Sequence, residues 1–569
     1  METFLKGCLA SASYLISGSP FDAADTDLDD GESVVSTTVN NNYDKQWKTT
    51  TPSFQADAPR FMAPGNATAA APLLCQSLEG ARGSPPQQQQ QQTFAPGQRL
   101  GKQTVGGGWV RPLGYAEKFM TAAHGYGCMT TVYSLWLDSR TPLSLDVIKY
   151  AATIMYRKMP NLRMEMAERD GRLWWREMAR EVVNVEELET RDVEGAVETL
   201  LKRRYDVKAG PLWFTRFIRL SPQEQGVRDD NHNLKYKYAC LFGFHHNVSD
   251  GTTNMKFCKV FLKVLNDLVQ GKEIDMCQEG TFAPPLQDRL ADRIGAYFLF
   301  VYMFLRRLYT CILTFGIPVR NFTSRFRMPA HNEAATRMIH HELDEDATRK
   351  LLRRCKMEGV TLNSAFTAAA NLTMYKMMAQ KGGRLKNTDL WSSQAVNMRR
   401  YWPKEQQSNS FGCHISLLDV SFPTGPDDER AFWRYARQVH ARLKYHLTES
   451  KRALTLQPMS ERLIILIRHN AWLAWLRLPS ANDGHYTVTN MGDLTHTFPG
   501  TGEEVEVSLV LRSVSCHFMP TLCQHTLQTF RGRFCYSLDY YTQKITKENA
   551  TTYAQGIMDF LRYAIHAPN

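Results

Sequence analysis

The sequence predicts a mixed α/β protein whose ordered part forms two lobes of similar size. The chain has 569 residues, which is more than one compact domain usually needs. Hydrophobic residues make up 43%, enough for two sizeable cores. Helix and strand signals alternate in both halves of the chain. Two such units packed together would form a cleft, where small-molecule sites tend to lie.

The first segment, residues 1–105, is predicted to be a disordered low-complexity region. It carries an acidic patch at 25–30 and a glutamine tract at 87–92. A stretch of this composition buries too little apolar surface to offset the entropy that ordering would cost.

The first lobe is predicted to span 106–290, with order beginning near Val110. Ser144 is placed to cap a helix, and Asp170-Gly171 predicts a tight turn between two strands. The predicted strands are Met129–Leu137, Leu162–Ala167, Arg172–Met178, Trp213–Leu220 and Leu234–Phe244. The predicted helices are Ser144–Met159, Glu194–Tyr205 and an amphipathic helix carrying Phe257, Val260, Phe261, Val264 and Leu268 on one face.

The crossover segment, 291–330, is apolar and then basic. Arg306 and Arg307 interrupt its apolar run at 294–318. Two central arginines cost roughly 2.5–3.5 kcal/mol each on membrane-insertion scales, so a single membrane span is not predicted. Two alternatives remain: an interfacial hairpin that meets a membrane surface through 294–327, and a buried helix or lid over an apolar tunnel.

The second lobe is predicted to span 331–569. Its predicted strands are Arg337–Leu343, 411–421, 485–490, 505–511 and 533–539. Its predicted helices are Asp344–Met357, Leu362–Met378, Phe432–Leu447 and Asn549–Ile565.

The net charge limits the kinds of binding partner, and the cysteine pattern indicates the cellular compartment. The net charge of +11 is compatible with an anionic partner, but no zinc-finger spacing and no RNA-binding aromatic motif is present, so no nucleic-acid partner is predicted. The twelve cysteines contain no C-x-x-C pair, a pattern typical of reduced thiols in an intracellular protein. Peripheral attachment to the cytoplasmic face of an endomembrane is the localisation that a membrane-binding crossover segment would imply.

The main chemical signal is the motif His245-His246-x-x-x-Asp250-Gly251. It lies between an apolar strand and an amphipathic helix, where an imidazole can be held rigidly. Acyl transfer to a hydroxyl or an amine needs a base that removes the proton of the nucleophile, and a neutral histidine can do this. We therefore expect His246 to be the catalytic base, with His245 and Gly251 as motif support. Asp250 is expected to form a salt bridge that holds the loop.

This motif and its surroundings resemble the chloramphenicol-acetyltransferase-like superfamily of HHxxxDG acyltransferases. The resemblance covers about residues 110 to 565 and is nearest to alcohol acetyltransferases and wax-ester synthase/diacylglycerol acyltransferases. Six short elements follow in order: Arg111–Gly114 with Glu117, Pro160–Arg163, Gly210–Trp213, Val396–Arg400, Asn409–Gly412 and Thr489–Gly492. Each of these matches is weak evidence alone, and their common order along the chain strengthens the resemblance.

The resemblance implies two chloramphenicol-acetyltransferase-like lobes in one chain, forming a pseudo-dimer with a central tunnel. It implies that Arg163 pairs with Asp250, that acyl-CoA is the donor substrate, and that transfer proceeds without an acyl-enzyme. Neither a metal nor a prosthetic group is implied. Residues expected to line the cleft are Trp213, Asn397, Arg399, Asn409, Asn490 and Gly492.

Two departures from the family narrow the function. No DFGWG element is present near the C-terminus, which argues against a plant BAHD enzyme, and the mid-chain motif means that a monomer could build the site. We therefore expect a monomeric acyl-CoA-dependent O-acyltransferase for an alcohol or lipid acceptor. The alternatives are an amide-forming N-acyltransferase or condensation enzyme, and a catalytically silent binding protein on the same fold.

Overall fold

The computed structural model describes residues 108–567, apart from 126, 222–226, 229–233, 286–321, 323–324, 327–332, 383–386, 408, 450–484, 499–502 and 516–520. The predicted disordered region 1–105 and nearly all of the crossover segment 291–330 lie outside the described residues. The membrane and lid alternatives for 294–327 therefore stay predictions. Within the described ranges, no helix combines the length and apolar character needed to cross a membrane.

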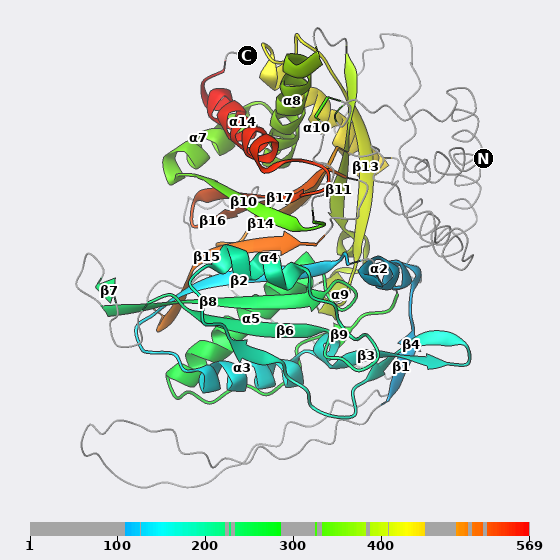
Figure 1. Ribbon diagram of the computed structural model, residues 1–569, viewed down its shortest axis with the longest axis vertical. Helices are drawn as coiled ribbons and strands as arrows, with labels where there is room; N and C mark the ends of the chain where they lie inside the picture. The colour runs from blue at the N-terminus through cyan, green and yellow to red at the C-terminus, as the bar shows by residue number, and fades with distance from the viewer. Residues whose placement is uncertain are drawn as a thin grey trace, which may run out of the picture.

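The chain folds as a mixed α/β structure around two large sheets (Figure 1). The first sheet has the strand order β15-β2-β8-β6-β5, with the short β7 paired to β8. Its strands are β2 (Thr130–Ser139), β5 (Val185–Glu187), β6 (Trp213–Arg219), β7 (Val227–Arg228), β8 (Leu234–His245) and β15 (Val505–Val514). The helices of this half are α2 (Tyr115–Gly125), α3 (Leu145–Lys158), α4 (Val193–Leu201) and α5 (Gly251–Val269).

The second sheet has the order β10-β17-β16-β14-β11-β13. Its strands are β10 (Thr336–Leu343), β11 (Thr388–Asn397), β13 (Ile415–Thr424), β14 (Tyr486–Asp493), β16 (Cys523–Phe530) and β17 (Arg533–Tyr541). The helices of this half are α7 (Glu345–Met357), α8 (Leu362–Gly382), α9 (Lys404–Gln407), α10 (Phe432–Lys444) and α14 (Lys547–His566). The described residues also form two small sheets, one of β1 (Trp109–Pro112), β4 (Arg172–Glu177) and β3 (Met164–Arg169), and one of β9 (Thr281–Phe282) and β12 (Ser410–Phe411).

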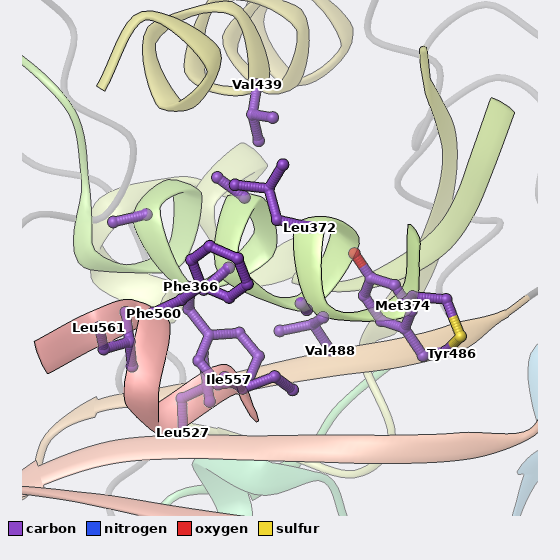
Figure 2. Close-up of a cluster of buried hydrophobic side chains, with 14 of the residues drawn as sticks. Phe366, Leu372, Met374, Val439, Tyr486, Val488, Leu527, Ile557, Phe560 and Leu561 are labelled. Carbon is purple, nitrogen blue, oxygen red and sulfur yellow. The ribbon is translucent and has the colours of Figure 1, made fainter. Parts of the chain in front are cut away.

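Each large sheet packs its own helices into a separate hydrophobic core. In the first half, apolar side chains of α3 and α5 pack against β2, β6 and β8. In the second half, α8, α10 and α14 pack against β14 and β16, as Figure 2 shows for Phe366, Val439, Val488, Leu527 and Ile557. The predicted mixed α/β architecture is therefore confirmed.

One strand of the second half completes the sheet of the first half. β15 pairs antiparallel with β2 over nearly its whole length, and Figure 1 shows it in orange beside β2. The side chain of Asn266 on α5 reinforces this join, because its Nδ2 donates to Val505 O at 2.9 Å and its Oδ1 accepts from Val505 N at 2.9 Å. The two halves therefore share a sheet and cannot separate without breaking it.

Most predicted elements lie where the sequence placed them, and one is divided. The strand predicted at 411–421 is split into β12 and β13 by Gly412, whose φ of +127° is a backbone conformation that favours glycine. The break matters for the site, because Gly412 O accepts hydrogen bonds from Thr253 and Arg399.

Candidate active site

The motif loop is a short connection between β8 and α5. β8 ends at His245, and α5 begins at Gly251. Asp250 caps the helix, because its Oδ1 accepts a hydrogen bond from Thr253 N at 3.0 Å. His246 N donates to Met129 O at 3.0 Å, which ties the loop to the start of β2. The loop is therefore anchored at both ends.

The imidazole of His246 is buried and neutral. Its side chain is 4% exposed, and its Nδ1 lies 3.6 Å from Cys413 Sγ. Burial, followed by the charge of Arg512, lowers the pKa of His246 to about 4, although the backbone groups of His246 and Ser249 and the charge of Asp250 oppose this shift. At neutral pH the ring is therefore in the unprotonated form that a general base requires.

His245 packs within the protein beneath the loop. It is fully buried, and its Nδ1 accepts a hydrogen bond from Asn247 N at 3.1 Å. Its ring lies 4.3 Å from that of His124 and 5.8 Å from that of Tyr205, centroid to centroid. These contacts fit the expected supporting role.

Asp250 is paired with Arg399, and the expected pairing with Arg163 is wrong. Arg399 Nη1 donates to Asp250 Oδ2 at 2.6 Å, and both side chains are almost fully buried. Arg163 instead donates through Nε to Glu177 Oε1 at 2.5 Å. Arg163 ends the 3₁₀ turn Pro160–Arg163, from which its side chain reaches β4 and the backbone of Arg157.

Arg399 joins the motif loop to the second half of the protein. Besides Asp250, it donates to Ser410 O at 3.0 Å, to Thr253 Oγ1 at 3.0 Å and to Gly412 O at 3.2 Å. Burial raises the pKa of Asp250, but the charge of Arg399 and the hydrogen bonds outweigh this effect and lower it to about 2. The carboxylate therefore stays ionised and holds the two halves together at the site.

The other residues expected to line the cleft divide into two groups. Asn397 lies beside the motif, with its Nδ2 donating to Thr252 Oγ1 at 3.0 Å. Asn490 and Gly492 flank Met491 at an irregularity near the end of β14, and the side chain of Met491 is 3.2 Å from where a Cβ on Gly251 would lie.

Among the described residues, the side chains of Trp213 and Asn409 make no hydrogen bond or ring contact with the motif loop. Trp213 is fully buried in the core, where its Nε1 donates to Leu162 O at 3.2 Å. Its ring also meets that of Phe257 edge-on, with the centroids 5.9 Å apart, so a cleft-lining role for Trp213 stays a prediction. Asn409 contributes its backbone oxygen to Thr281 in the small sheet.

Three residues at the site were not predicted from the sequence. Cys413 contacts His246, and His414 N donates to Asp250 Oδ2 at 2.8 Å. Arg512, on β15, lowers the pKa of His246 through its charge. Cys413 and His414 directly follow the Asn409–Gly412 element, and this position in the sequence could have marked them as site residues. No feature of the sequence around Arg512 marks it in this way.

The described residues were also considered as possible metal ligands. Within the part of the chain that the structure describes, no group of three or more histidine, cysteine, aspartate or glutamate side chains is placed to hold a metal ion.

Comparison with known families decides the class of the protein. The alcohol acetyltransferase family model matches residues 203–495, which is more than half of the chain and includes the motif loop and Arg399. The chain belongs to the alcohol acetyltransferase family. Membership of this family supports acyltransferase activity. No curated protein matches the chain in sequence.

Solved structures share the fold of this alcohol acetyltransferase family member. The trichothecene 15-O-acetyltransferase TRI3 from Fusarium sporotrichioides aligns with a TM-score of 0.57 at 15% identity, over 80% of this chain and 95% of that one. The condensation domain of the monacolin K polyketide synthase MokA aligns with a TM-score of 0.54 at 13% identity, over 80% of this chain and 98% of that one. At these identities the likeness shows the fold alone, and it confirms the fold that the resemblance implied.

Proposed function

We propose that the protein transfers an acyl group from acyl-CoA to the hydroxyl of an alcohol or lipid acceptor, with His246 as the general base. The observation that carries this proposal is the buried, neutral imidazole of His246 in a loop fixed by the Asp250–Arg399 ion pair. Membership of the alcohol acetyltransferase family supports the hydroxyl acceptor and the thioester donor.

In the proposed reaction, His246 removes the proton of the acceptor hydroxyl as its oxygen attacks the thioester carbonyl carbon. A tetrahedral intermediate forms and then collapses, breaking the carbon–sulfur bond. The proton held by His246 passes to the departing thiolate, so that ester and free CoA leave. The chain itself supplies no covalent intermediate in this sequence of steps.

A screen of acyl-CoA donors against alcohols tests the proposal, with release of free CoA thiol as the readout. Purified wild-type protein should transfer to at least one alcohol, and His246→Ala should lower kcat by about 10²-fold or more, since a positioned base contributes 10²–10⁴. The melting temperature should change little. The matched control is His566→Ala, because His566 is exposed near the end of α14.

Amines belong in the same screen, because the same base could deprotonate them. Transfer to amines alone would replace the ester product with an amide and leave the role of His246 intact. Full turnover in His246→Ala, or no turnover by wild-type protein with any donor and acceptor, would refute the proposed function.

A further inference from the structure

Arg512 is a buried arginine that has no carboxylate partner among the described residues. Its residue is 5% exposed, and its Nη1 donates to Thr526 Oγ1 at a long 3.3 Å. Its Nε has no hydrogen-bond partner within the described structure. Burying a charge without a partner is costly, so a guanidinium in this state is suited to a ligand that supplies the missing acceptor.

The surroundings of Arg512 place it beside the motif. Arg512 on β15 is directly opposite Tyr133 on β2, and opposed residues of an antiparallel pair share one face of the sheet. The Tyr133 hydroxyl lies 3.7 Å from where a Cβ on Gly251 would be built. Arg512 therefore faces the start of α5, where the His-motif loop ends.

Two further buried polar atoms at this place make no hydrogen bond of good geometry within the described residues. They are the Tyr133 hydroxyl and Asn254 Oδ1, and both residues are at most 1% exposed. Burial raises the pKa of Tyr133, and the charge of Arg512 together with side-chain hydrogen-bond contributions from Asn254 and Arg512 opposes this shift, so the three side chains form one cluster. The charge of Arg512 also lowers the pKa of the His246 imidazole, which places the cluster within electrostatic reach of the base.

We infer that Arg512, together with the Tyr133 hydroxyl, binds the carbonyl oxygen of the acyl donor and stabilises the oxyanion that forms there. The inference rests on the proposed acyl transfer. As the acceptor oxygen bonds to the carbonyl carbon, the π electron pair moves to the carbonyl oxygen, and the guanidinium neutralises that charge. The pair returns when the carbon–sulfur bond breaks, so Arg512 neither gains nor loses a proton.

A purely structural role for Arg512 would be to neutralise the charge of Asp539, its buried neighbour. Asp539 Oδ2 accepts from Val514 N at 3.0 Å, and no ion pair joins it to Arg512 within the described ranges. Burial raises the pKa of Asp539 to about 7, so this carboxyl is protonated for much of the time at neutral pH and makes a weak counter-ion. The cluster at the motif is the better account of the guanidinium.

The test compares the pH dependence of kcat for the full-length wild type, Arg512→Met and Arg512→Lys, using the best donor and alcohol from the screen. Arg512 acts on His246 as well, because its positive charge lowers the pKa of that ring. Its loss should therefore raise this pKa and move the acid limb of the profile to higher pH. An oxyanion role further predicts that the plateau above this limb falls by about 10²–10³, with partial recovery in Arg512→Lys and little change in KM for the alcohol.

Arg216→Met is the matched control, because Arg216 is equally buried but contacts Asn184 and Glu186 at the far edge of the sheet. It should keep the plateau. If Arg512→Met shifts the limb but reaches the wild-type plateau, or loses only thermal stability, the oxyanion role is overturned while the proposed function stands. If wild-type protein transfers no acyl group, the proposed function fails and this inference fails with it.

Discussion

The carboxylate of Asp250 performs three tasks within the active-site loop. It caps α5 through Thr253 N, accepts a hydrogen bond from His414 N and pairs with Arg399. Because all these partners are buried, no water is available to replace the carboxylate. The end of the loop that follows His246 is therefore held mainly by this one side chain, while the backbone of His246 is fixed by Met129 O.

Replacing Asp250 by alanine should destabilise the protein by about 3–5 kcal/mol, because the guanidinium of Arg399 would remain buried without its partner. The double variant Asp250→Ala/Arg399→Met should lose less than the sum of the two single variants, since neither charge then stays unpaired. Urea denaturation of the three variants and of the wild type measures both effects.

Arg163→Met is the control for this pair, because Arg163 is the partner that family resemblance suggested. Its ion pair with Glu177 is partly exposed and separate from Asp250, so its loss should cost much less than the loss of Asp250. A loss in Arg163→Met as large as that in Asp250→Ala would contradict the assignment of Arg399.

At the residue scale, the sequence predicted the base and its loop but not the contacts that fix them. The spacing of His246 and Asp250 identifies the motif by itself. Arg111 and Glu117, which the resemblance placed in one element, form an ion pair with Nη2–Oε1 at 2.7 Å, a contact that was not predicted. Arg399 was expected only as a cleft residue, because nothing in a sequence says which of two arginines approaches a carboxylate. No motif surrounds Arg512. It lies beside the His motif only because β15 pairs with β2, which is far away in the sequence.

At the scale of elements, Gly243 shows how closely β6 and β8 pack. Gly243 faces Phe214 across the antiparallel pair, and the ring of Phe214 occupies the space that a side chain would need. A Cβ on Gly243 would lie 2.0 Å from Phe214 Cζ. The close packing of β8, which ends at His245, against Phe214 therefore requires glycine at position 243.

Gly243→Ala should destabilise the protein by about 1–3 kcal/mol, because Phe214 is fully buried and has little room to move. Gly125→Ala is the control, since a Cβ there would meet nothing within 4 Å. Thermal unfolding followed by circular dichroism should show a lower Tm only for Gly243→Ala. Equal melting temperatures for the two variants would show that β8 and β6 can relax apart.

Element prediction succeeded where the apolar pattern was strong and failed where buried positions are polar. β8 was predicted from its change to continuous apolar residues, and its second half is fully buried. β16 was missed, although it is buried along its whole length, because it carries Gln524, His525 and Gln528 in its interior positions. β11 was missed for the same reason, since Ser392 and Gln394 occupy its buried face. Apolar periodicity cannot detect such strands.

At the scale of the whole molecule, the two mixed α/β units were predictable, but their join was not. The strand at 505–511 was expected in the second lobe, whereas β15 completes the first sheet beside β2. Hydrophobic pattern predicts that a segment is a strand and does not say which sheet receives it. The crossing of β15 also brings Arg512 from the second half to the motif of the first.

The described part of the molecule contains several buried neutral histidines, which makes its stability sensitive to acid. Burial lowers the pKa of each, to about 4 for His246 and His485 and about 3 for His414 and His525. Among the described residues, buried histidines with a lowered pKa are His124, His245, His246, His414, His485 and His525. In the unfolded chain these rings titrate near an ordinary pKa of about 6.5.

The sign of the pH dependence follows from proton binding. As pH falls from 6.5 to 4.5, the unfolded chain protonates the imidazoles of His246, His414, His485 and His525, which the folded chain leaves largely neutral, so unfolding becomes more favourable. Asp419 and Asp539 act in the opposite direction, because burial raises their pKa to about 6 and about 7 and the folded state binds their protons. Four imidazoles minus two carboxyls leaves about two extra protons on the unfolded chain, each lowering the free energy of unfolding by about 1.4 kcal/mol per pH unit.

The free energy of unfolding, measured by urea denaturation from pH 6.5 to 4.5, should therefore fall steeply as the solution is acidified. His485→Gln should reduce the slope by one proton, because the amide oxygen can still accept the hydrogen bond that His485 Nδ1 accepts from Trp391 N. A free energy that stays constant or rises over this range would mean that the buried rings are protonated in the folded protein. His246 would then be charged, and the neutral base on which acyl transfer depends would be missing at these pH values.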